Sequence, residues 1–326
     1  MLFFTKLCLL ALLVYYIYQH LRTQSQDDIN NIFSKQILSI SNLIYLIIAF
    51  CLVPLNWYFE SLKFSSLFLA SRKYSRKESL NIILVGVSFA LITPLKIGEF
   101  AGRLVLTDKK DWKAALWANF LGNWCQWIAL AFFGIVGLQF MLNYIQKFSY
   151  NQLILVNILL LLVIILLIYF LFKRHLWVAL VLRFIPGKYY NYFVNSESEI
   201  KLIDKTKILN ACVFAALRYW VYTIQFALIL KFFGSDISFF ICICAVSTIY
   251  FFQLMLPFLS WMGLIGRTGI AIFVLHSIEV NEIISGIATL SLWVLNMVLP
   301  ALVGIYLIFQ FRLTKTIQNE KEINHL

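Results

Sequence analysis

Long apolar runs separated by short basic loops recur along the whole chain. Six of these runs approach the roughly 20 residues that a helix needs to cross a bilayer. They predict membrane-spanning helices at Leu2–Gln19, Ile37–Phe59, Lys113–Leu142, Gln152–Phe172, Ile208–Phe232 and Asn281–Phe311. The predicted fold is therefore an all-α polytopic membrane protein, in which residues 1–326 form a single integral membrane domain.

Two further apolar segments, residues 79–106 and 237–275, are interrupted in the middle by proline, glycine and charged residues. Basic residues flank the first segment on both sides, in Lys63–Lys77 and in Lys109–Lys113. Cytoplasmic loops carry an excess of Lys and Arg, so both flanks are predicted to be cytoplasmic and the segment to be a re-entrant hairpin.

The second segment is interrupted between Leu256 and Gly269 and would enter from the opposite face. Two broken segments of opposite orientation are typical of inverted-repeat transporters, whose binding site lies near the bilayer midplane. The alternative is that Pro257 merely kinks an ordinary span. With six spans and two hairpins, the charge of the loops predicts a multi-pass membrane protein with both termini cytoplasmic.

Composition narrows the function classes. Hydrophobic residues make up 62% of the 326 positions and charged residues 13%, which excludes an ordinary soluble domain. The net charge of +12 comes from loops that orient the spans, so nucleic acid is not an expected partner. The six cysteines and four histidines form no ligand-like spacing, and no glycine-rich phosphate loop occurs, so neither a metal nor another cofactor is expected.

The interruption at Leu91–Leu106 carries the strongest functional signal. Thr93 and Pro94 are predicted to start a half-helix, which would place Lys96, Glu99 and Arg103 on one face. Free backbone N–H groups at a helix start attract anions, and in a membrane the available anion is a lipid phosphate. The alternative is a purely structural Glu99–Arg103 pair, since these residues have the i, i+4 spacing that favours pairing.

Polar residues also recur at helical spacing in or beside three predicted spans. Asn56, Glu60 and Lys63 form one stripe at the cytoplasmic end of the second span; the other two are Asn119, Asn123 and Gln126, and Arg218, Tyr222 and Gln225. They predict a shared polar interior, with plain interhelical hydrogen bonding as the alternative. The predicted substrate-binding residues are Thr93, Pro94, Lys96, Gly98, Glu99, Arg103, Arg218 and Arg267, and the predicted polar pathway comprises Asn56, Glu60, Asn119, Asn123 and Gln126.

The stretch TPLKIGEFAGR, Thr93–Arg103, resembles the Thr-Pro…Gly-Glu…Arg signature of a flippase-like family typified by the transmembrane region of lysylphosphatidylglycerol synthases. NWYFESLKF before it and GNWCQW after it support the resemblance. The residues of this chain that match the family's motif are Pro94, Gly98, Glu99 and Arg103. The family often has Gly-x-Arg-Glu in the second repeat, whereas this chain has Gly266-Arg267-Thr268 and lacks the acid.

The resemblance implies an inverted-repeat protein of the bacterial inner (plasma) membrane that exposes modified phospholipids or handles polyprenyl-linked lipids. The predicted function is therefore binding and translocation of an anionic phospholipid or a polyprenyl phosphate, without aminoacyl transfer by this polypeptide. One alternative is a non-transporting membrane partner of a lipid synthase or glycosyltransferase. Another is an intramembrane lipid-modifying enzyme with Glu99 as general base, although no nucleophile constellation accompanies it. The sequence leaves the lipid, the direction of movement and the oligomeric state open.

Overall fold

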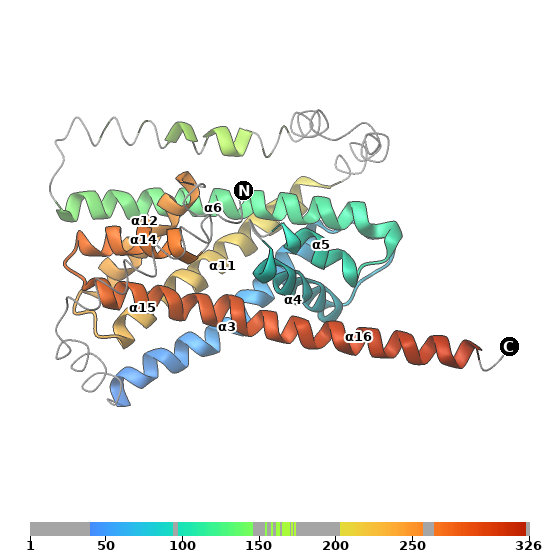
Figure 1. Cartoon of the computed structure of the whole chain (residues 1–326). Helices are drawn as coiled ribbons and strands as arrows, with labels where there is room; N and C mark the ends of the chain where they lie inside the picture. The colour runs from blue at the N-terminus through green and yellow to red at the C-terminus, as the bar shows by residue number, and fades with distance from the viewer. Residues whose placement is uncertain are drawn as a thin grey trace, which may run out of the picture. The chain divides into compact units, whose positions relative to one another are not determined.

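The computed structural model describes residues 40–93, 97–145, 203–256 and 264–323, together with scattered residues between 154 and 173. Those residues are helical and include no β-strand (Figure 1). The elements are α3 (Ile40–Leu67), α4 (Arg76–Ile92), α5 (Gly98–Val105), the 3₁₀ turn η3 (Lys109–Asp111), α6 (Trp112–Ile145), α11 (Lys205–Phe232), α12 (Phe239–Met255), α14 (Leu264–His276), α15 (Glu282–Trp293), the π-helical turn η4 (Val294–Val298) and α16 (Leu299–Ile323).

Four helical segments in the described part are long and apolar enough to cross a membrane: Asn42–Leu67, Lys109–Ile145, Lys205–Phe232 and Glu282–Phe311. Large apolar side chains such as Ile47, Phe140 and Tyr306 lie exposed on them, as expected where lipid covers the surface. The chain is therefore a membrane protein. The four helical segments lie at the positions of four of the six predicted spans. Leu2–Gln19 lies outside the described residues, and Gln152–Phe172 is described only in part.

The chain divides into two compact units. Unit 1 comprises the described parts of Met1–Pro54, Trp127–Leu166 and Tyr219–Trp293, and it contains α12 and α14. Unit 2 comprises the described parts of Leu55–Gln126, Leu167–Arg218 and Val294–Leu326, and it contains α4 and α5. Each unit thus holds one of the two interrupted apolar segments.

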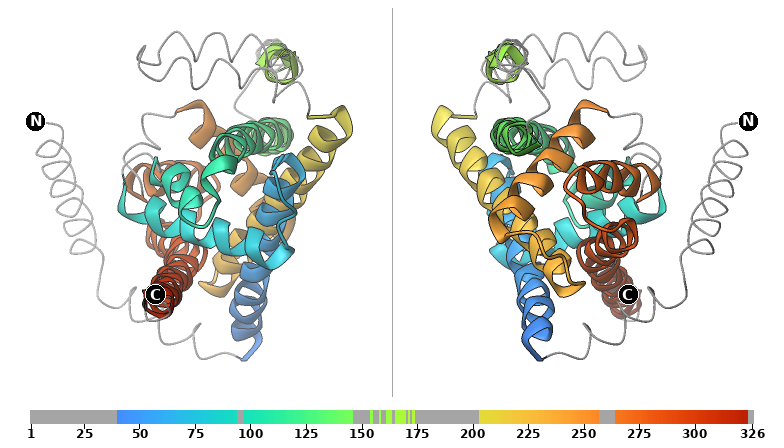
Figure 2. Two further views of the ribbon diagram at one scale, coloured as in Figure 1. Left: turned by 90° about the vertical axis from the view of Figure 1, so that its right-hand side faces the viewer. Right: turned by 90° about the vertical axis from the view of Figure 1, so that its left-hand side faces the viewer.

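In unit 2 the first interrupted segment is a pair of helices, α4 and α5, that fold back against each other (Figure 2). A capping box of Ser75 and Glu78 starts α4. The chain before α4 contacts the chain after α5: the Ser71 N–H donates to Asp111 Oδ1 at 2.7 Å, and the Tyr74 hydroxyl donates to Asp111 Oδ2 at 3.1 Å. The segment therefore leaves and returns to one end, as a hairpin does.

Glycines let the two helices approach closely. A Cβ atom on Gly102 would lie 2.9 Å from the Cα of Gly86, and one on Gly86 would lie 2.8 Å from Cγ of Arg103. Real Cβ atoms do not tolerate such contacts. The aliphatic part of the Arg103 side chain therefore packs directly against Gly86, and this contact helps to position the guanidinium group.

The last span packs against α4 and is locally widened. The Ser88 hydroxyl donates to the Ala301 carbonyl oxygen at 2.8 Å, which ties α16 to α4. Pro300 lacks an N–H, and in a regular α-helix its ring would clash with the carbonyl group four residues earlier, at Asn296. The helix is instead π-helical at this point, in the turn η4 (Val294–Val298), which contains Asn296.

In unit 1 the second interrupted segment is also a pair of contacting helices, α12 and α14. The break is shorter than the predicted Leu256–Gly269, because α14 already begins at Leu264. Gly266 and Gly269 are thus helical, and the packing of buried Ile270 and Val274 outweighs the roughly 1 kcal/mol that each glycine costs. Pro257, the predicted kink, lies outside the described residues.

Candidate functional site

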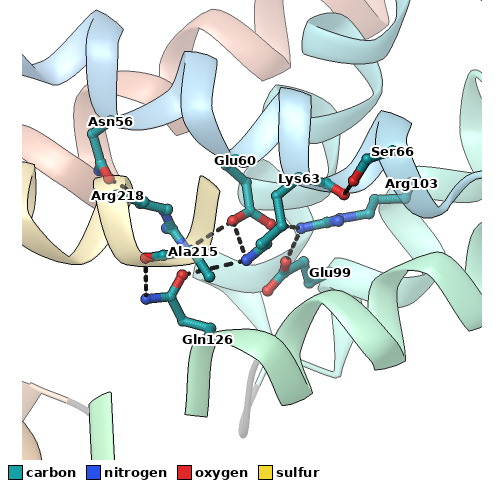
Figure 3. A network of polar contacts seen from close by, with 9 residues as sticks. All are labelled: Asn56, Glu60, Lys63, Ser66, Glu99, Arg103, Gln126, Ala215 and Arg218. Atoms are coloured by element: carbon teal, nitrogen blue, oxygen red, sulfur yellow. Dashed lines mark hydrogen bonds and ion pairs between the residues drawn. The ribbon is translucent and has the colours of Figure 1, made fainter. Parts of the chain in front are cut away.

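The centre of the site is Glu60, a glutamate of α3 whose side chain is only 2% exposed. Three cations from three helices of unit 2 surround its carboxylate (Figure 3). Lys63 Nζ of α3 lies 2.6 Å from Oε2, Arg218 Nη1 of α11 lies 2.8 Å from Oε2, and Arg103 Nη2 of α5 lies 2.9 Å from Oε1. These four residues and Glu99 are called the charge cluster below.

Glu99 joins the cluster through Arg103, whose Nη2 donates to Glu99 Oε1. The predicted i, i+4 pair is therefore confirmed. The cluster contains three cations and two carboxylates, so it carries a surplus positive charge. Glu60, Lys63 and Arg103 are at most 2% exposed, whereas Glu99 is 17% and Arg218 is 21% exposed. Glu99 and Arg218 are therefore the members of the cluster that are partly exposed.

Neutral amides orient the cations. Arg218 Nε donates to Asn56 Oδ1 at 3.1 Å, and Asn56 Nδ2 donates to Asn296 Oδ1 at 2.7 Å. Gln126 Oε1 accepts a hydrogen bond of 3.4 Å from Lys63 Nζ, and its Nε2 donates to the Ala215 carbonyl oxygen at 3.3 Å (Figure 3). Because the amides carry no charge, they fix the geometry without cancelling the surplus positive charge.

Aromatic rings and a free donor complete the site. The guanidinium of Arg218 lies 5.2 Å from the ring centre of Trp57, and that of Arg103 lies 5.2 Å from the ring centre of Phe64. Such contacts add cation–π attraction and exclude water. Within the described part of the chain, the buried Nε–H of Arg103 has no acceptor. A buried donor without a partner costs about 1–3 kcal/mol, so this group calls for a specific explanation.

The structure brings six of the predicted site residues together: Asn56, Glu60, Glu99, Arg103, Gln126 and Arg218. Asn119 of α6 is buried, and neither atom of its amide has a partner among the described residues. Asn123 is half-buried on the same helix. Whether any of these residues contacts a substrate remains a hypothesis.

Two local predictions need correction. Thr93 does not directly precede a helix: it ends α4, and α5 begins at Gly98. Its backbone N–H still donates to Phe89 O, while its side-chain Oγ1 accepts the Gly98 N–H at 2.8 Å, so it caps α5 from five residues upstream. Pro94 and Lys96 lie outside the described residues, so their predicted roles stay predictions.

Glu60 and Lys63 were expected at the end of the second span, because the apolar run stops at Phe59. They lie instead inside α3, which continues to Leu67. The length of the apolar run underestimates the length of this helix, because the run is taken to end at the first charged residue, as if that residue had to face water. Here opposite charges neutralise one another in the interior, which makes burial tolerable.

Sequence reasoning missed two contributors, Asn296 and Gly86. It named Lys63 in the same stripe as Asn56 and Glu60 but left it out of the predicted polar pathway. Asn296 is a lone amide in the apolar run of the last span, which is a weak signal. Gly86 gave no signal, because its importance lies in the contact with Arg103 from another helix.

Arg267 belongs to unit 1 rather than to the charge cluster's unit. It lines a small cavity of about 20 Å³ together with Tyr222, Tyr250 and Thr289. That volume holds roughly one water molecule. The predicted substrate role of Arg267 therefore concerns this small cavity in unit 1.

Comparison of the chain with protein-family profiles, with curated proteins and with solved structures gives no match. The charge cluster itself is therefore the basis for the function discussed next.

Proposed function

We propose that this membrane protein binds the phosphate of an anionic lipid at the charge cluster and helps the headgroup cross the bilayer. The observation that supports the proposal is the convergence of Lys63, Arg103 and Arg218 on one buried carboxylate, with a positive charge in surplus. Two arginines offer planar N–H donors that match phosphate oxygens.

A purely structural role explains the cluster less well. Buried ion pairs seldom stabilise a fold more than apolar residues of similar volume would, and ionisable residues inside a membrane are costly. A balanced pair of Glu99 and Arg103 would be enough to hold α5. The additional cation and the unpaired Nε–H of Arg103 are features that an anionic ligand would satisfy.

The location of the cluster suits a headgroup that enters from the membrane. Arg218 lies at the middle of α11, and its side chain is partly exposed. A phosphate arriving there meets a guanidinium that Asn56 and Trp57 already orient. Such preorganisation lowers the cost of removing the headgroup from water.

The proposal of translocation, rather than binding alone, draws on the two broken helix pairs. One pair lies in each unit, α4 with α5 and α12 with α14, which is the arrangement an inverted-repeat transporter would have. Membership in the flippase-like family, six full spans and cytoplasmic termini belong to the same proposal. The phosphate could come from a phospholipid or from a polyprenyl phosphate.

The test is mass spectrometry of the lipids that co-purify with the protein. Arg218→Gln removes one positive charge of α11 from the cluster. Lys231→Gln removes one from the end of the same helix, where Lys231 Nζ donates only to the Ser235 carbonyl oxygen among the described residues. We expect a phosphate lipid to be enriched with the wild type and with Lys231→Gln, and to be depleted with Arg218→Gln.

The identity of the enriched lipid distinguishes the phospholipid from the polyprenyl phosphate. Identical lipid profiles for all three proteins would refute the binding site. They would favour the alternative of a non-transporting partner, which needs no lipid at the cluster.

A further inference from the structure

We propose that the incoming phosphate takes the place of the Glu60 carboxylate on Arg103 and Arg218, and that Glu60 binds one proton in exchange. The inference rests on the proposed function and adds a coupled proton to it. It follows from three features of the cluster.

The first feature is that Glu60 occupies the position an anionic ligand needs. Its Oε1 pairs with Arg103 at 2.9 Å, and its Oε2 pairs with Arg218 at 2.8 Å and with Lys63 at 2.6 Å. The carboxylate therefore acts as an internal counter-ion for all three cations. A phosphate that engages the same guanidinium groups has to displace it.

The second feature is the set of groups around Glu60. The charged groups that face it are Lys63 from α3, Arg103 from α5 and Arg218 from α11, with Glu99 reached through Arg103. The amide of Gln126 from α6 contacts Lys63, and Asn296 from η4 reaches Arg218 through Asn56. The cations are thus the only groups that stabilise ionised Glu60 among the described residues.

The consequence is a proton requirement. Once a phosphate binds these cations, ionised Glu60 would lie against another anion with its counter-ions taken, in a water-poor interior where like charges repel strongly. Uptake of a proton from water converts the carboxylate to a neutral carboxylic acid. Its O–H can then donate to a phosphate oxygen, a short charge-assisted hydrogen bond.

The third feature is the resulting charge balance. One phosphodiester anion and one proton add no net charge to the cluster. A lipid phosphate and a proton would therefore enter the site together, and they would move together if the site changes its side of access. A proton gradient would then bias the direction of lipid movement.

The experiment measures binding of phosphatidylglycerol to the purified full chain in detergent micelles, as a function of pH. This lipid carries a phosphodiester that does not titrate near neutral pH, so any proton uptake belongs to the protein. A pH-sensitive dye in weakly buffered solution counts the protons taken up by the wild type. We expect about one proton per bound lipid, and an affinity that rises about tenfold for each pH unit of acidification while Glu60 is ionised in the free protein.

Two variants locate the proton. Glu60→Gln mimics the neutral acid, so its binding should be independent of pH and should take up no proton. Glu99→Gln is the matched carboxylate-to-amide change within the same cluster: its affinity can differ, but the pH slope should remain. Glu60→Gln leaves three cations around a neutral group, so the proton count on the wild type provides a test that does not depend on its folding.

Binding of phosphatidylglycerol by the wild type without proton uptake would overturn the inference and leave the proposed function standing. Equal proton uptake by wild type and Glu60→Gln would also overturn it. If the wild type binds neither phosphatidylglycerol nor a polyprenyl phosphate, the proposed function itself fails.

Discussion

Replacing Gly86 by alanine should push Arg103 out of the charge cluster. The added Cβ would lie 2.8 Å from Arg103 Cγ and 3.2 Å from the backbone oxygen of Glu99. Carbon atoms in good contact are about 3.5–4.0 Å apart, so α5 or the arginine has to shift by roughly 0.7 Å or more. The pair of Arg103 Nη2 and Glu60 Oε1, now 2.9 Å apart, would lengthen or break.

The expected destabilisation follows from overpacking of the α4–α5 contact, which typically costs about 1–3 kcal/mol. Alanine also gains up to about 1 kcal/mol over glycine in a helix interior, and this gain would mask part of the effect. Gly269→Ala in α14 provides the matched control, because a Cβ there has nothing within 4 Å. The gain in helix propensity from glycine to alanine is common to both variants, so the difference in stability between them isolates the steric cost.

Thermal unfolding in detergent, followed by intrinsic tryptophan fluorescence, measures both variants against the wild type. We expect Tm of Gly86→Ala to fall below that of Gly269→Ala by several degrees, on the order of 5 °C. Phosphatidylglycerol binding should weaken in parallel for Gly86→Ala alone. If the two variants unfold at the same temperature, α4 and α5 do not approach as described and the placement of Arg103 is wrong.

Three further predictions concern unit 2. Ser75→Ala removes the hydroxyl that accepts the Glu78 N–H at 3.1 Å, and it should lower the free energy of unfolding by about 1 kcal/mol in a denaturant titration. Hydrogen bonds from the Ser75 N–H and, to a smaller extent, from Arg72 hold the pKa of Glu78 below its ordinary value. Ionised Glu78 therefore stabilises the folded state above its unfolded pKa, and this stabilisation is lost as the pH falls below about 4. The variant Glu78→Gln should not lose stability in that pH range. Asn296→Leu leaves Asn56 Nδ2 without its acceptor and should cost about 1–3 kcal/mol, whereas an unchanged stability would contradict the buried bond.

The amino-acid sequence alone predicts the membrane class, the two interrupted segments and the pairing of Glu99 with Arg103. All three depend on neighbouring residues only. An apolar run of sufficient length has to be buried in lipid, and residues four apart on a helix face each other whatever the rest of the chain does. The interruption of the helix after Ile92 could be predicted from the sequence for the same reason, although the residue at which α5 begins could not.

Which polar side chains meet, by contrast, depends on how the helices pack. Glu60 and Arg103 are 43 positions apart, and Asn56 and Asn296 are 240 apart. Such contacts depend on how each helix is rotated about its axis and how closely its backbone approaches the next, which Gly86 sets for Arg103. A stripe on one helix shows which residues share a face but not which face of another helix it meets. For that reason the sequence placed Glu60 at the end of a span, whereas in the structure it lies at the centre of the charge cluster.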